Sequence, residues 1–192
     1  AGVFSLEDGL KLIAHRSKLM QNLPQNGEMV AIFAEVKTVQ EAIAGYGDEI
    51  AIAAFNGNHI VMSGTQETVE KVTQSFKEKN IKTRKLKVSH AFHSPLMRPI
   101  LADFEKVAQE INYNQPRIEI ISNLTGQQVT AEITKPEYWV NHIIEPVKFA
   151  DSIDYLAKQE YQIFLEIGSQ PTLLGMGRLV LETEENTTQY YW

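Results

Sequence analysis

The segment from Met29 to Val88 restricts the possible folds of this chain more than any other stretch. Short apolar runs typical of strands alternate in it with two amphipathic runs typical of helices. The expected strands cover residues 29–36, 50–55, 59–63 and 81–88, and the expected helices cover residues 39–46 and 65–79. Asn56-Gly57 separates the second strand from the third, and Asn-Gly is a strong signal for a β-hairpin turn. The predicted order is strand, helix, strand, strand, helix, strand.

This order is that of the split βαβ, or ferredoxin-like, unit. The flanking sequence has a different character, because long amphipathic runs predict helices over residues 6–21, 95–111, 150–158 and 172–181. Strands are expected over residues 118–122 and 162–167. Gln162 to Ile167 is almost continuously apolar, which is typical of a strand buried in a parallel sheet. We therefore predict a small subdomain inserted between two parts of a larger one.

The overall composition excludes several classes of protein. The chain has 192 residues, of which 43% are hydrophobic, so it can bury a sizeable core in one domain or in a domain with a subdomain. Its net charge of -6 argues against binding to duplex nucleic acid. The absence of cysteine excludes disulfides and thiolate chemistry, and no apolar run or signal peptide predicts contact with a membrane. We expect a cytoplasmic protein.

The stretch from Val88 to Met97 contains the strongest candidate for chemistry. His90 and His93 flank Ala91-Phe92 between the end of an expected strand and a helix that opens with Pro95. A basic side chain at such a junction can be held rigidly and still reach a substrate. The alternative is a pair of surface loop histidines. Metal binding is disfavoured because the chain has no cysteine and no third ligand at a suitable spacing.

Six stretches, in this order along the chain, carry a resemblance to a known family. They are Ala1–Leu10 with Arg16–Gln21, Ala54–Gly57 with Val61–Gly64, His90–Ser94, Tyr138–His142, Pro146–Phe149, and Glu166–Gly168 with Pro171–Leu174. Together they resemble the malonyl-CoA:acyl-carrier-protein acyltransferase family, and in particular the acyltransferase domains of modular type I polyketide synthases. The most specific of these stretches is His90-Ala91-Phe92-His93-Ser94.

The resemblance implies a two-step acyl transfer. A serine in a Gly-His-Ser-x-Gly turn attacks the thioester of malonyl-CoA, and the phosphopantetheine thiol of an acyl carrier protein then takes the acyl group. A histidine moves the protons in both steps, and the motif match assigns this role to His93. The family's orienting backbone carbonyl matches His142. No metal and no bound cofactor are implied; the substrates are malonyl-CoA and the phosphopantetheinylated carrier protein.

The resemblance also implies four residues that bind the substrate. Arg16 matches the arginine that binds the malonyl carboxylate, where a planar guanidinium suits two parallel hydrogen bonds. The alternative is an ordinary surface arginine that lies along the apolar stripe of its helix. Asn56 matches an active-site asparagine. His90 and Phe92 match positions that favour malonyl over methylmalonyl groups, with a discrimination of about 1–3 kcal/mol.

One family motif has no counterpart in this sequence. No Gly-x-Ser-x-Gly occurs in the 192 residues, and in the family it would lie just upstream of Ala1. We therefore expect part of an acyltransferase domain that is inactive alone. The expected fold is α/β, with a partial α/β-hydrolase-like parallel-sheet subdomain over residues 1–26 and 90–181. A ferredoxin-like βαββαβ small subdomain covers residues 27–89, and residues 182–192 begin a linker.

The expected partners follow from the same resemblance. They are an acyl carrier protein, malonyl-CoA and the neighbouring domains of a synthase, with no nucleic acid and no membrane. Two other functions remain open from the sequence. The chain is then either a non-catalytic remnant that serves as a docking module in a synthase, or a free-standing binding module with a ferredoxin-like core.

Overall fold

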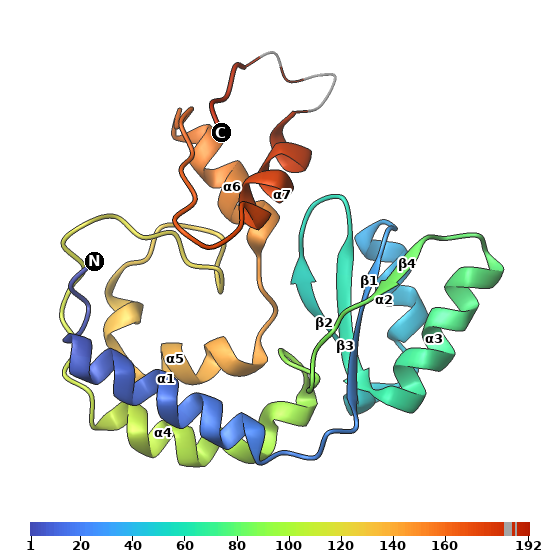
Figure 1. The fold of residues 1–192 in the computed structure, drawn as a ribbon, viewed down its shortest axis with the longest axis horizontal. Helices are drawn as coiled ribbons and strands as arrows, with labels where there is room; N and C mark the ends of the chain where they lie inside the picture. Colours follow the sequence, from blue (N-terminus) through green and yellow to red (C-terminus); the bar gives the residue numbers. More distant parts are fainter. Residues whose placement is uncertain (183–185, 187) are drawn as a thin grey trace.

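A four-stranded antiparallel sheet lies on one side of the molecule, and helices with long connections make up the rest (Figure 1). This computed structural model describes residues 1–182, 186 and 188–192. The strands are β1 (Gly27–Ile32), β2 (Ile50–Phe55), β3 (Ile60–Thr65) and β4 (Thr83–Lys85), in the spatial order β2-β3-β1-β4. Helices α2 (Val36–Ile43) and α3 (Gln66–Glu78) connect them, with a short 3-10 helix η1 (Gly47–Glu49) before β2. The elements follow one another in the order expected from the sequence.

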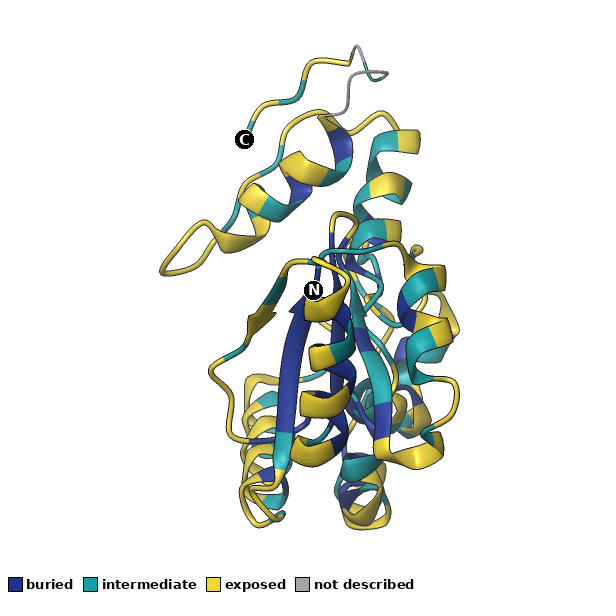
Figure 2. Ribbon diagram, turned by 90° about the vertical axis from the view of Figure 1, so that its right-hand side faces the viewer, coloured by how far each residue is buried: buried dark blue, intermediate teal, exposed yellow. Residues whose placement is uncertain are grey.

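Helices α2 and α3 cover one face of this sheet and bury its apolar residues. Val39 of α2 and Phe76 of α3 pack against Val30 and Ile32 of β1. Phe76 is 1% exposed, and β1 and β3 are buried along almost their whole length, as the dark blue strands of Figure 2 show. The core of this small sheet is therefore closed by residues of the segment itself.

The connection into β1 passes very close to the His90–His93 stretch. A Cβ atom on Gly27 would lie 2.5 Å from the backbone nitrogen of Ala91. Such a distance is too short for any side chain, so only glycine fits at this position. The two ends of the small sheet segment, near residues 27 and 90, consequently lie side by side.

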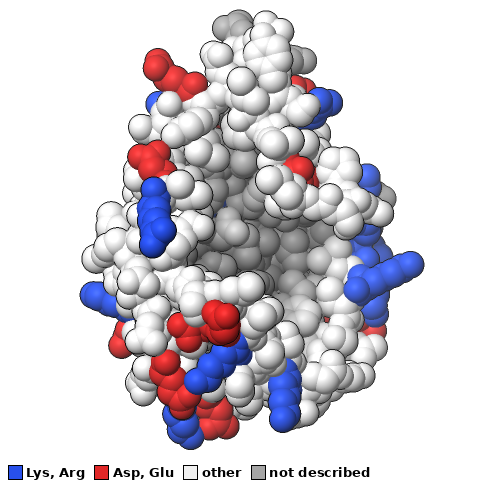
Figure 3. Space-filling model, turned by 60° about the vertical axis from the view of Figure 1, so that its left-hand side comes forward, with Lys and Arg blue, Asp and Glu red and all other residues white. Residues whose placement is uncertain are grey.

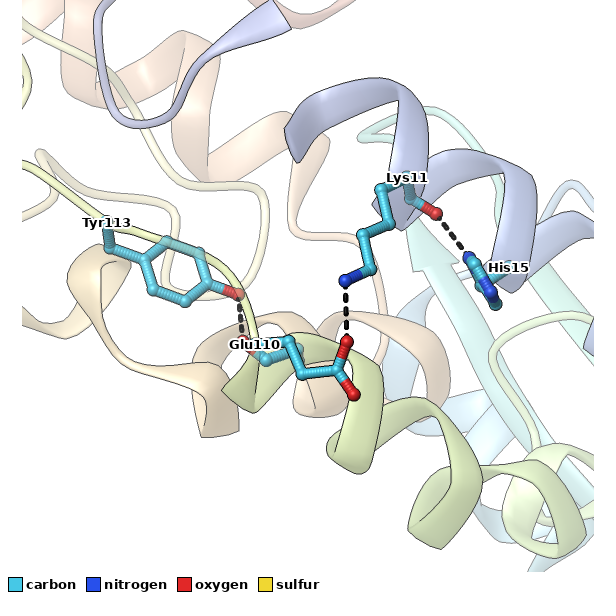
Figure 4. Close-up of polar contacts among 5 residues, drawn as sticks. Lys11, His15, Glu110 and Tyr113 are labelled. Carbon is cyan, nitrogen blue, oxygen red and sulfur yellow. Dashed lines mark hydrogen bonds and ion pairs between the residues drawn. The ribbon is translucent and has the colours of Figure 1, made fainter. Parts of the chain in front are cut away.

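A second core lies between three helices outside the sheet. These are α1 (Leu6–Gln21), α4 (Leu101–Gln109) and α5 (Pro136–Ile144), with the 3-10 helix η2 (Pro95–Ile100) leading into α4. Lys11 of α1 forms an ion pair of 2.5 Å with Glu110 at the end of α4, and the Tyr113 hydroxyl donates to the Ala108 carbonyl (Figure 4). The helix expected over residues 95–111 is split, because Pro99 lacks the amide that a continuous α-helix would need there.

The strands expected outside the small sheet are not formed. Ile121 makes only an isolated bridge to Gln128, and Ile163 makes only an isolated bridge to Tyr191. The remaining elements are η3 (Ala131–Thr134), α6 (Phe149–Lys158) and α7 (Thr172–Leu181). The described residues thus form no parallel sheet, and the prediction of a parallel-sheet subdomain is wrong for this chain by itself. A strand requires a neighbour for its backbone groups, and residues 162–167 have none beyond that bridge.

Two apolar surfaces remain uncovered by the described residues. Leu6, Leu10 and Ile13, apolar residues of the amphipathic run that forms α1, are all exposed, with Leu10 at 58%. Leu165 and Ile167, in the segment predicted to be a strand, are 82% and 93% exposed. Figure 3 shows a face of the molecule that is hollowed at its centre and carries charged side chains around the edge.

The end of the chain is described only in part. The prediction of a linker over residues 182–192 falls partly on residues 183–185 and 187, which lie outside the described residues. Trp192 stacks on Phe164 at 4.8 Å between ring centroids, so the described end lies against the segment after α6. Among the described helices, none combines the length and the apolar composition that a membrane span requires.

Candidate active site

His93 lies at the sharp turn between β4 and η2. Its backbone has a φ of 54°, in the left-handed region that a residue other than glycine rarely adopts. The next residue, Ser94, is fully buried; its hydroxyl donates to the Ala91 carbonyl at 2.6 Å and accepts the Leu96 amide at 3.3 Å. These two bonds fix the turn on both sides of the histidine, as expected for a side chain whose direction matters.

The imidazole of His93 is oriented by a backbone carbonyl. Its Nδ1 donates to the Glu145 carbonyl at 2.8 Å. Because a carbonyl only accepts, Nδ1 carries the proton and Nε2 keeps its lone pair in the neutral ring. The sequence assigned this role to the His142 carbonyl, and that assignment is wrong. Helix α5 ends at Ile144, and Glu145 is extended, with φ and ψ of -73° and 151°, so its carbonyl turns away from the helix axis.

The surroundings of His93 favour its neutral form. Burial lowers the pKa of His93 below the ordinary 6.5, the Glu145 carbonyl partly opposes this, and the positive charges of Arg16 and His142 lower it further. Burial and Arg16 also lower the pKa of His142. A histidine whose pKa lies below 6.5 is mostly unprotonated near neutral pH and can accept a proton there.

Arg16 reaches the same place from helix α1. Its pKa is lowered by burial, although an arginine stays charged under any ordinary condition. Among the described residues, no hydrogen bond or ion pair includes its guanidinium. Helix α1 is positioned by the Lys11–Glu110 pair on α4 (Figure 4). A half-buried cation without a carboxylate partner, next to a neutral histidine, provides a place for an anion.

Asn56 lies at the end of β2 in a small polar cluster. Its side chain is buried, and Nδ2 donates to His59 Nε2 at 2.9 Å, while His59 Nδ1 donates to Asn58 Oδ1 at 2.7 Å. Burial, and then the charge of Arg84, lowers the pKa of His59. His59 is not among the residues predicted from the sequence. The available signal was its spacing of three residues from Asn56 across the Asn-Gly turn, which brings the two side chains together.

The structure separates the roles of His90 and Phe92. His90 is 2% exposed; its Nε2 donates to the Leu23 carbonyl at 3.2 Å and its Nδ1 lies 2.8 Å from the Ser89 hydroxyl. A side chain this buried contacts mainly the surrounding protein, and the role of His90 in binding the acyl group stays a prediction. His90 packs against Phe92, with 5.9 Å between ring centroids, and thereby positions it.

Phe92 lies between the helical core and the face of the sheet that α2 and α3 do not cover. It packs against the cluster of α1, α4 and α5 and also against Met29, Ala53 and Val61 of the sheet. His142 lines a cavity of 350 Å³ together with Tyr138 and Trp139. Arg16 and His93 do not line this cavity in the described part of the chain. The described residues contain no group of three or more ligands suited to a metal ion.

A comparison with protein families shows to which family this chain belongs. The chain matches the family described as acyl transferase domain over residues 1–190 and belongs to it. The known proteins that it resembles are polyketide synthases. It is 42% identical over 190 residues to the spectinabilin polyketide synthase system protein NorB of Streptomyces orinoci, covering 98% of this chain and 9% of that protein. It is 40% identical to the mycoketide-CoA synthase of Mycobacterium tuberculosis, covering 97% and 4%.

Solved acyltransferase structures have the same fold over the length of this chain. The acyltransferase domain from the second module of the salinomycin polyketide synthase matches with a TM-score of 0.92 and 41% identity, covering 96% of this chain and 44% of that one. The malonyl CoA-acyl carrier protein transacylase of Clostridium perfringens matches with a TM-score of 0.88 and 27% identity, covering 100% and 61%. The chain therefore has the α/β fold of an acyltransferase domain but spans less than two thirds of these structures.

Proposed function

We propose that this chain is part of an acyltransferase domain that transfers a malonyl unit from malonyl-CoA to the phosphopantetheine thiol of an acyl carrier protein. The transfer passes through an acyl-serine whose serine is not among these 192 residues. The observation that carries the proposal is the His93 imidazole oriented by the Glu145 carbonyl, with the charge of Arg16 near enough to lower the pKa of His93. The first suits a proton-transfer base, and the second suits the carboxylate of malonate.

His93 moves one proton in each half of the reaction. Its Nε2 takes the hydroxyl proton of the serine as the oxygen attacks the thioester carbonyl. When the carbon–sulfur bond breaks, the same proton passes to the departing CoA thiolate. In the second half, Nε2 takes the proton of the carrier thiol, which attacks the acyl-serine, and returns it to the serine oxygen. The Glu145 carbonyl, at 2.8 Å from Nδ1, stabilises the imidazolium that forms in between.

Arg16 and Phe92 determine which acyl group is accepted. The guanidinium of Arg16 binds the free carboxylate of the malonyl group, which acetyl and other uncharged groups lack. Phe92, which packs against His90, the helical core and the sheet, fills the space beside the acyl α-carbon. A methyl branch there would clash, which is worth about 1–3 kcal/mol of discrimination. Asn56 and His59 form the opposite, small-sheet side of the site.

The proposed partners are the carrier protein, malonyl-CoA and neighbouring synthase domains. The relatives are multidomain synthases, and this chain spans 9% or less of the two named above, which supports such a setting. The alternative function is that of a non-catalytic docking module within a synthase.

Incubation of the longer protein with malonyl-CoA, followed by intact-mass measurement, distinguishes these two functions. We expect a covalent malonyl adduct, and its formation is slowed by about 10²–10⁴-fold in the His93→Ala variant. His15→Ala is the matched control, because His15 is exposed on α1 and its ring donates to the Lys11 carbonyl of its own helix (Figure 4). No adduct on a protein that contains the segments missing here would refute catalysis and support the docking function.

The role of Arg16 is tested by comparing acyl donors. Replacing Arg16 by Ala removes a charge-assisted contact worth about 1.5–3 kcal/mol, so malonyl transfer should fall by roughly 10- to 100-fold. Transfer from acetyl-CoA should change little. Arg98→Ala is the control, since Arg98 is exposed and paired with Asp48. An unchanged preference for malonyl-CoA in the Arg16→Ala variant would contradict the proposed contact.

A further inference from the structure

The segment that orients His93 is itself bound to the small sheet. Val147 forms a parallel bridge with Ala54: its amide donates to the Ala53 carbonyl at 2.8 Å, and its carbonyl accepts the Phe55 amide at 2.8 Å. The following amide, of Lys148, donates to the Asn123 carbonyl at 2.7 Å. Two residues before Val147 is Glu145, whose carbonyl accepts the bond from His93. The small sheet and the histidine therefore share one short piece of backbone.

The edge strand β2 is shaped to receive Val147. β2 lies at the end of the sheet order, and its pairing with β3 has a register shift between Ile52 and Ala54. Ala53, at this bulge, is fully buried and supplies the carbonyl that Val147 binds. Bulges bend a strand and redirect the groups around them, and they are frequent next to active sites. Asn56 follows at the end of the same strand.

The connection between the two contacts is short and stiff. Only Pro146 separates Glu145 from Val147, and its ring fixes φ near -65°. A residue before proline is also restricted to extended conformations, as Glu145 is. A shift of Val147 along β2 therefore also moves the Glu145 carbonyl, because the backbone between them has little freedom to absorb the shift.

We propose that Val147 is a positioning residue, whose backbone pairing with β2 keeps the Glu145 carbonyl on Nδ1 of His93. The small sheet thereby selects the ring tautomer that leaves Nε2 as the base. The importance of this tautomer for transfer rests on the proposed function. The coupling between the sheet and the imidazole does not, and it can be measured without any acyl substrate.

Three groups face His93 and must be considered together in such a measurement. The Glu145 carbonyl follows helix α5, the Arg16 guanidinium comes from α1, and the His142 ring comes from α5. The carbonyl stabilises the protonated ring, whereas the positive charge of Arg16, and that of His142 when it is protonated, disfavour it. If only the carbonyl is displaced, the pKa of His93 should fall further below 6.5.

Two variants of Val147 separate the backbone bond from the side chain. Val147→Pro removes the amide that donates to Ala53, and Val147→Ala keeps it. We would record the ¹⁵N shifts of the His93 ring, assigned with a His93→Gln variant, across a pH titration. We expect one tautomer, with the proton on Nδ1, in the parent and in Val147→Ala. Val147→Pro should show a mixture of both tautomers and a lower pKa for His93.

A second variant covers the case in which Val147→Pro disturbs the whole fold, which would be visible as lost amide protection in β1 and β3. Pro146→Gly keeps all hydrogen bonds possible but loosens the connection, so it should produce a smaller change of the same sign. An unchanged tautomer and pKa of His93 in both folded variants would overturn the coupling. A malonyl adduct formed at the normal rate by a longer Val147→Pro protein with mixed tautomers would overturn the role of the tautomer in transfer, whereas failure of every variant and the parent to form an adduct would count only against the proposed function.

Discussion

The small sheet and the helical surroundings of His93 differ in how completely they bury their apolar residues. In the sheet segment, Phe76 and its neighbours are shielded by α2 and α3 on one face. In contrast, Leu6 and Leu10 of α1 and Leu165 and Ile167 after α6 are exposed. Both regions have strongly patterned sequences. The pattern thus shows which side chains need burial, and says nothing of whether their partners belong to the same segment.

This difference matters because the site lies where the two regions meet. His93 is bonded to a carbonyl after α5, which is connected to the edge of β2, and Arg16 comes from the partly uncovered helix α1. One half of the site rests on a closed core. The other half depends on how firmly α1 remains on α4.

Truncation of one large apolar side chain in each region tests the contrast most directly. Phe76→Ala should lower the free energy of unfolding by about 3–5 kcal/mol, because it leaves a cavity in the sheet core. Leu165→Ala should change it by no more than about 0.5 kcal/mol, since the side chain is 82% exposed. Urea unfolding followed by circular dichroism measures both. A large loss for Leu165→Ala would show that residues 162–167 are packed in solution.

Helix caps provide a second, smaller comparison. The Thr65 hydroxyl accepts the Thr68 amide at the start of α3, and the Ser5 hydroxyl accepts the Asp8 amide at the start of α1. Thr65→Ala should reduce the free energy of unfolding by about 0.5–2 kcal/mol. The loss for Ser5→Ala should lie at the lower end of that range, because Leu6 and Glu7 in the first turn of α1 are exposed. Equal losses in urea unfolding would indicate that α1 unfolds together with the sheet.

The position of Arg16 can be followed through the histidines. If α1 stays on α4 in solution, Arg16→Ala should raise the pKa of both His93 and His142, since a nearby positive charge is removed. Arg98→Ala should leave both values unchanged. NMR titration of the ring protons measures them, and unchanged values in Arg16→Ala would mean that α1 is detached.

The same shift predicts a dependence of stability on pH. The pKa of folded His93 lies below the ordinary 6.5, so the unfolded chain binds the proton first as the pH falls. The contribution of the neutral ring to stability is complete above 6.5 and is lost as the pH falls through the lowered folded value. Arg16→Ala should narrow this window.

The smallest expected effect concerns the contact that fastens α1. Lys11 lowers the pKa of Glu110 below its ordinary 4.5, through their hydrogen bond and then through its charge. In Lys11→Met the pKa of Glu110 should return towards 4.5, and the accompanying loss of stability should vanish as the pH falls through the lowered value. Lys106→Met, which removes a pair within α4, should leave the pKa of Glu110 unchanged. Titration of the Glu110 carboxyl followed by NMR measures this pKa in each variant.

Local signals were enough to predict the elements of the small sheet and the bounds of α1. Ser5, two acids and an apolar stripe predict a helix to about Gln21, and the structure has Leu6–Gln21. The Asn-Gly turn and the two helices place β2 and β3 correctly. What failed was long-range: residues 162–167 have the composition of a buried strand, but a strand needs a neighbour that local pattern does not supply.

The site shows the same limit at the level of single atoms. His93 and Arg16 were predicted by resemblance, and their proximity depends on the docking of α1 onto α4, which no local pattern encodes. The carbonyl that orients His93 has no side-chain signature. A usable signal was Pro146. A proline restricts the residue before it to an extended conformation, so Glu145 cannot continue α5, and the helix ends at Ile144. Whether α5 ends at residue 144 decides which carbonyl is available.

The close passage of Gly27 beside Ala91 has a consequence for engineering. Since the chain enters and leaves the small sheet at neighbouring points, residues 27–89 form a cassette whose two junctions lie together. Such a cassette could be exchanged for the matching piece of another synthase without changing the path of the remaining backbone. The exchange would have to preserve the glycine at the first junction and the position of the acceptor carbonyl at residue 53, two backbone requirements that do not depend on the side chains of the site.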